Sequence, residues 1–175
     1  MKQLKTQEEA ENYFLGFAKV ILAIKNVEKI VITRVQGKAV GGGVGLIAAS
    51  DYSFASIDST VRLSELSIGI GPFVIGPALE RRMGMSAFAA MSLDCNWKDA
   101  RWCLEKGLFS DVSSSIVEMD QKIDELLSNL SKCNPLSLVQ LKKVLWEGAV
   151  DWENLLRQRA KKTASCCDRS TSTSR

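Results

Sequence analysis

One stretch decides the fold of this chain: Gln36-Gly37-Lys38-Ala39-Val40-Gly41-Gly42-Gly43-Val44-Gly45-Leu46. A strand rich in β-branched residues leads into three consecutive glycines, and residues suited to a buried helix follow. Glycine has no Cβ atom, so a ligand oxygen can approach its backbone, and the start of a helix presents unpaired N–H groups and the positive end of the helix dipole. The stretch predicts a backbone anion site, although a phosphate loop or a purely structural turn uses similar residues.

A lone carboxylate follows about twenty residues later, in the segment Leu63-Ser64-Glu65-Leu66-Ser67-Ile68-Gly69-Ile70-Gly71-Pro72. The apolar neighbours of Glu65 should remove water from its carboxyl group, which raises the pKa of a carboxylic acid and suits it to proton transfer. The alternative is a structural glutamate at the end of a strand that faces solvent or caps the next helix.

The sequence contains no histidine. Serine–histidine–aspartate and cysteine–histidine mechanisms, histidine metal sites and imidazole acid–base catalysis are therefore excluded. Proton transfer would have to rest on carboxylates, lysines, tyrosines or water.

The composition is that of an ordinary folded domain, with 175 residues, 46% of them hydrophobic and 25% charged. The net charge of +3 gives no case for nucleic-acid binding. Five cysteines, an odd number without metal-ligand spacing, predict neither a disulfide framework nor a metal site. Without a signal peptide or an apolar run of membrane-spanning length, we expect no membrane association and a cytoplasmic location, with an organelle matrix as the alternative.

Apolar periodicity places strands and helices in an α/β order. A strand, a helix and a second strand around the glycines should form a parallel crossover. We expect strands over Lys29–Gln36, Asp51–Ser56, Val61–Leu63 and Phe109–Val112. We expect helices over Glu8–Ile24, Gly43–Ser50, Ala78–Met83, Ser86–Ser92, Trp97–Glu105 after a cap at Asn96, Ile116–Ser131, Pro135–Trp146 and Asp151–Lys162.

Several motifs together resemble the enoyl-CoA hydratase/isomerase (crotonase) superfamily. They are Ala39-Val40-Gly41-Gly42-Gly43, Ala48-Ala49-Ser50-Asp51, Glu65 four residues before Gly69, the segment 76–87 and the segment 100–108, and the resemblance covers most of residues 8–163. It implies a crotonase-like (ClpP/crotonase) spiral α/β fold, here partial, with a C-terminal helical region. It also implies an acyl-CoA thioester as substrate, with coenzyme A entering as part of that substrate and no separate cofactor.

The resemblance also assigns roles to residues. The N–H group of Gly42 would stabilise a thioester enolate in an oxyanion hole, and Glu65 would be the general acid and base. Substrate-binding positions would be Gly41, Gly43, Gly69, Gly71 and Pro72.

The first of the two glutamates that hydratases use would fall at Gly45 and is absent. This difference favours double-bond isomerisation with a single base over hydration, and we keep hydratase and isomerase as a joint prediction. The alternative is a non-catalytic interaction or regulatory protein of the same fold.

In the family, ββα units precede the triple glycine and supply the second oxyanion donor, so we expect the N-terminal third to be missing. We expect a partial crotonase core over residues 1–133, a helical region over 134–163 through which the full-length protein forms a trimer or hexamer, and a disordered tail over 164–175.

Other polar and aromatic residues fit structural roles better than functional ones. Asp51 follows a helix and reads as structural, and the run Glu80-Arg81-Arg82 reads as a solvated face. Lys142 and Lys143 could meet coenzyme phosphates or lie on the polar face of a helix. The four tryptophans fit core or interface positions better than a ligand cage; they are Trp97, Trp102, Trp146 and Trp152.

Overall fold

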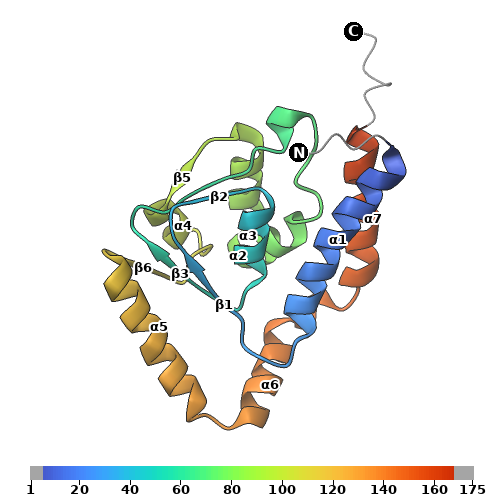
Figure 1. The fold of residues 1–175 in the computed structure, drawn as a ribbon. Helices are drawn as coiled ribbons and strands as arrows, with labels where there is room; N and C mark the ends of the chain where they lie inside the picture. Colours follow the sequence, from blue (N-terminus) through green and yellow to red (C-terminus); the bar gives the residue numbers. More distant parts are fainter. Residues whose placement is uncertain (1–5, 168–175) are drawn as a thin grey trace.

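The computed structural model describes residues 6–167 and contains two small sheets with helices packed around them (Figure 1). The strands are β1 (Ile32–Val35), β2 (Lys38–Val40), β3 (Tyr52–Ser56), β4 (Thr60–Arg62), β5 (Lys98–Asp99) and β6 (Asp111–Ser113). The α-helices are α1 (Gln7–Asn26), α2 (Gly42–Ala49), α3 (Gly76–Asp94), α4 (Ala100–Glu105), α5 (Ile116–Ser131), α6 (Pro135–Leu145) and α7 (Trp152–Cys167). Two 3₁₀ turns complete the described elements, η1 (Leu66–Ile68) and η2 (Glu147–Ala149).

Each sheet has three strands. In the first, β3 lies between β1 and β6, and both pairings are parallel. In the second, β4 pairs in parallel with β2 and antiparallel with β5. The parallel pairing of β1 with β3 across α2 confirms the predicted crossover.

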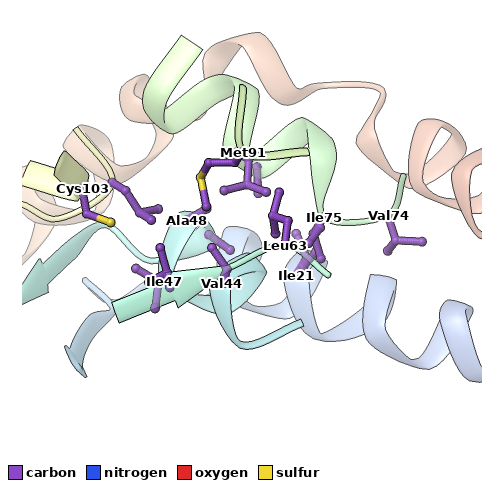
Figure 2. Packing of buried hydrophobic residues seen from close by; sticks show 14 of the residues in the cluster. Ile21, Val44, Ile47, Ala48, Leu63, Val74, Ile75, Met91 and Cys103 are labelled. Atoms are coloured by element: carbon purple, nitrogen blue, oxygen red, sulfur yellow. The ribbon is translucent and has the colours of Figure 1, made fainter. Parts of the chain in front are cut away.

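Helix α2 lies at the centre of the molecule because its residues are apolar on every side. Five of its residues are buried: Val44, Gly45, Ile47, Ala48 and Ala49. Figure 2 shows Val44, Ile47 and Ala48 of this helix among the buried side chains, with Met91 of α3 close to them. A helix that is hydrophobic all round is stable only inside a core.

Helices α1 and α7 run antiparallel side by side along one flank of the molecule (Figure 1). Buried residues of α7, Leu156 and Ala160, belong to the same hydrophobic core as Ile21 of α1 and the residues of α2. The C-terminal helical region is thus part of the packing that positions α1.

The interior contains one buried ion pair, between Lys142 of α6 and Asp51, among the described residues. Lys142 Nζ lies 2.7 Å from Asp51 Oδ2 and also donates to the carbonyl oxygens of Ile24 and Lys29. Asp51 accepts further hydrogen bonds from Trp146 Nε1 and from the backbone N–H of Val31. The structural interpretation of Asp51 is confirmed, whereas Lys142 is buried instead of facing phosphates or solvent.

Two further sequence interpretations differ in part from the structure. Glu80 is exposed, but Arg82 points inward and donates to Ser53 Oγ and Ser110 Oγ, so the run is not a uniform solvated face. Trp146 and Trp152 lie in the core with their rings edge to face, as predicted, whereas Trp97 is partly exposed.

Strand and helix boundaries show where sequence patterns were insufficient. The β-branched run does not lead straight into the glycines, because Gly37 turns the chain with a φ of 78° and β2 intervenes. The helix expected from Trp97 begins at Ala100, capped by Asp99 instead of Asn96, and β5 occupies residues 98–99. The predicted break between the helices at 83 and 86 is confirmed as a kink at Gly84 within α3.

Helix α7 continues to Cys167, so residues 164–167 of the predicted tail are helical, and Ala164 is buried. Residues 168–175 of that tail lie outside the described residues. All five cysteines are free thiols, and none of the helices described is long and apolar enough to cross a membrane.

Candidate functional site

A cavity of about 210 Å³ lies where α1, the start of α2, the segment 64–75 and α7 meet. Five residues predicted for the site line it: Gly41, Gly42, Glu65, Gly71 and Pro72. Two others, Gly43 and Gly69, are not among the residues that line it. The structure therefore brings the triple glycine and the lone glutamate together, although more than twenty residues separate them in the sequence.

The glycines form the N-terminus of α2. Gly41 has a φ of 53°, which is in the left-handed range, and its N–H donates to the carbonyl oxygen of Arg62. The hydrogen bonds of the helix begin with the N–H groups of Val44 and Gly45, which both donate to the carbonyl oxygen of Gly41. The N–H groups of Gly42 and Gly43 come before this first helical bond, as the donors of an anion site at a helix start do.

The Glu65 carboxyl group lies directly against this helix start. A Cβ atom added to Gly41 would stand 2.9 Å from Glu65 Oε1, and the positive φ angle of Gly41 itself favours glycine at this position. Glu65 precedes η1 without capping it by its side chain, and its Oε2 is buried without a hydrogen-bond partner among the described residues. Neither the solvent-facing nor the capping alternative matches this placement.

Burial raises the pKa of the Glu65 carboxyl above its ordinary value of 4.5, and the nearby backbone N–H groups of Glu65 and Ser64 oppose part of this rise. A carboxylic acid in an apolar site holds its proton more strongly and, once ionised, is a stronger base. The surroundings of Glu65 thus favour proton transfer at a pH nearer neutrality than for an exposed glutamate.

Gly45, where the resemblance would place a second glutamate, has no room for a side chain. A Cβ atom there would lie 2.3 Å from Ile75 Cγ2 and 2.8 Å from Ile75 Cβ. Glu65 is accordingly the one carboxylate among the described residues that line the cavity.

The aromatic and aliphatic wall of the cavity was not predicted from the sequence. Its members are Tyr13, Phe14 and Phe17 from α1, Ile68, Ile70, Phe73, Val74 and Ile75 from the segment after Glu65, and Thr163 from α7. Apolar periodicity predicted the helix that carries Tyr13, Phe14 and Phe17, but it could not show that these side chains border a cavity.

The arrangement can stabilise negative charge on an oxygen while a nearby carboxyl group moves a proton. The N–H of Gly42 and the α2 dipole would supply the first function, and Glu65 would supply the second. Among residues 6–167 no group of three or more histidine, cysteine, aspartate or glutamate side chains is placed to hold a metal ion.

Comparison with known proteins shows which family the sequence is similar to. The family model described as enoyl-CoA hydratase/isomerase matches residues 1–170. The chain is 30% identical over 118 residues to the 2,3-dehydroadipyl-CoA hydratase of Escherichia coli K12, an alignment that covers 67% of this chain and 46% of that protein. It is 24% identical over 150 residues to the peroxisomal Delta(3,5)-Delta(2,4)-dienoyl-CoA isomerase of Arabidopsis thaliana, covering 81% and 51%.

Among solved structures, an enoyl-CoA hydratase from Mycobacterium avium superposes with a TM-score of 0.87 at 24% identity, covering 94% of this chain and 64% of that one. This likeness confirms the predicted crotonase-like α/β fold. The chain spans about half the length of the curated relatives it matches.

Proposed function

Because this chain belongs to the enoyl-CoA hydratase/isomerase family, we propose that it binds an enoyl-CoA thioester and moves its double bond, with Glu65 as the single proton-transferring group. The observation that carries the proposal is the Glu65 carboxyl, packed against the N-terminus of α2, whose Oε2 is buried and has no hydrogen-bond partner in the described part of the chain. The cavity provides no second carboxylate from the described residues, and hydration in the two-glutamate enzymes depends on one.

The proposed reaction begins with a 3-enoyl thioester whose carbonyl oxygen accepts a hydrogen bond from the N–H of Gly42. The Glu65 carboxylate removes a proton from carbon 2, and the electrons move toward the carbonyl oxygen to give a dienolate. The neutral Glu65 carboxyl then returns the proton to carbon 4, and the double bond forms between carbons 2 and 3. No proton or water is consumed overall.

The N–H of Gly42 would assist formation of the dienolate by stabilising the negative charge that develops on its oxygen. An N–H donor aimed at an oxygen that becomes negative typically contributes about 3 kcal/mol to the transition state. The α2 dipole adds to this, because negative charge is favoured near a helix N-terminus.

The test follows conversion of a 3-enoyl-CoA to the conjugated 2-enoyl-CoA by the protein and by Glu65→Gln. We expect the substitution to lower turnover by about 10²- to 10⁴-fold, the usual contribution of general acid–base catalysis. Glu80→Gln is the control, because Glu80 is exposed on α3 and does not line the cavity.

Two outcomes would overturn the proposal. If Glu65→Gln retains turnover within a few-fold of the parent, Glu65 is not the proton-transferring group. If the parent binds the thioester without converting it, the non-catalytic alternative replaces the proposal.

We also propose self-association through residues 134–163, as a trimer or hexamer. The support is the apolar surface of α6, where Leu136, Leu141 and Val144 are each about half exposed or more. Exposed apolar patches of this kind commonly mark protein interfaces.

A further inference from the structure

Two apolar side chains close the face of α2 that borders Glu65. Phe17 of α1 lies over both Gly42 and Gly45: a Cβ atom at position 42 would be 2.9 Å from Phe17 Cε2, and one at position 45 would be 3.4 Å from Phe17 Cε1. Ile75 fills the remaining space at Gly45, 2.3 Å from the same Cβ position. Positions 42 and 45 are three residues apart on a helix, so they lie on one face.

Both side chains also line the cavity that holds Glu65 and Gly42. Neither has a hydrogen-bond donor or acceptor. A water molecule held firmly for reaction needs two to four polar partners. Besides Glu65, the polar side chains that line the cavity are those of Tyr13, Ser64 and Thr163, and the Thr163 hydroxyl already donates to the carbonyl oxygen of Arg159.

We infer that Phe17 and Ile75 determine reaction specificity, by excluding from Glu65 the water that hydration would need. Isomerisation requires no water, because the proton that Glu65 removes returns to the same substrate molecule. A dry wall has a second effect: it slows exchange of that proton with solvent. This inference rests on the proposed function and adds the residues that would direct it.

The experiment measures two ratios with a 3-enoyl-CoA substrate in ²H₂O. The first is the amount of 3-hydroxyacyl product relative to conjugated 2-enoyl product, and the second is the deuterium incorporated per molecule of 2-enoyl product. Both ratios are independent of the fraction of protein that is folded.

The variants are Phe17→Ala and Ile75→Ala, with the milder Phe17→Leu and Ile75→Val as a second pair. Opening the wall should raise the hydration ratio by about tenfold or more, within the range that small apolar changes in a pocket produce. Deuterium incorporation should rise in the same variants. The control is Ile47→Ala, which removes a buried side chain of α2 that does not line the cavity and should leave both ratios unchanged.

The outcomes separate this inference from the proposed function. If the parent isomerises the substrate but neither ratio changes in any Phe17 or Ile75 variant, the inference is wrong and the proposed function stands. If both ratios rise in Ile47→Ala as much as in the Phe17 and Ile75 variants, loosened packing explains the rise and the inference is again wrong. If the parent hydrates without isomerising, the proposed function itself fails.

Discussion

Substituting Gly45 by alanine tests the packing on which the site interpretation depends. Alanine in place of a helical glycine normally stabilises a helix by about 1 kcal/mol. Here the new Cβ would lie 2.3 Å from Ile75 Cγ2 and 2.8 Å from Ile75 Cβ. A rotamer change moves Cγ2 but not Cβ, so the backbone of Ile75, a buried residue at the start of α3, has to move.

Overpacking of this kind costs about 1–3 kcal/mol, and a clash that no rotamer relieves belongs in the upper part of that range. After subtracting the helix-propensity gain, we expect Gly45→Ala to lower the free energy of unfolding by about 2 kcal/mol. Gly43→Ala is the matched control on the same helix, because its Cβ would meet only Ala39 Cβ at 3.8 Å, an ordinary contact.

Urea denaturation of both variants gives the two free energies. In an Ile75→Gly background, where both clashing atoms are gone, Gly45→Ala should cost much less than in the parent. Ile75 does not restrict position 45 if Gly45→Ala is as stable as Gly43→Ala, or if Gly45→Ala costs the same free energy in the two backgrounds.

Two further predictions concern buried charges. The raised pKa of Glu65 means that its ionised form is disfavoured in the folded state, so the stability that this group contributes is fully present below about pH 4.5 and is lost as the pH rises through the raised pKa. The melting temperature of Glu65→Gln minus that of the parent should therefore increase with pH across this window, and a difference that stays constant or decreases would contradict the burial argument. Lys142→Met leaves Asp51 without its buried cation and should cost about 3 kcal/mol or more, whereas Lys143→Met, which changes the exposed neighbour, should stay within about 0.5 kcal/mol. Equal costs for the two lysines in urea denaturation would show that the buried pair contributes nothing specific.

The helices could be predicted well because their apolar spacing is local. The helix expected over Glu8–Ile24 is observed as α1, Gln7–Asn26, and the predicted start of α6 at Pro135 is observed. The short strands were harder to predict. Strands β2 and β5 consist of three and two residues and are defined by their pairing with β4. No periodicity can develop in so few residues, and their partner is distant in the sequence.

The site was predictable where a residue type is itself unusual. A run of three glycines and a carboxylate in an apolar segment both identified positions that line the cavity, Gly42 and Glu65 among them. The sequence did not identify Phe17 and Ile75 as cavity residues, because an apolar residue has the same sequence pattern in a core and at a cavity wall. It did not identify Lys142 as part of a buried ion pair, because a lysine on a helix has the same pattern whether it is exposed or buried. Only tertiary contacts distinguish these cases.

The residues that surround Glu65 link the stability of the fold to the chemistry of the site. Burying a carboxyl group whose Oε2 has no hydrogen-bond partner among the described residues opposes folding. Burying an isoleucine side chain such as Ile75 contributes about 1.5–3 kcal/mol in the opposite direction. If Ile75 excludes water from Glu65, as inferred above, the same side chain favours the neutral carboxyl and offsets part of the cost of burying it. A polar replacement at position 75 would lose both effects at once, because it would hydrate the carboxyl and remove the apolar contact.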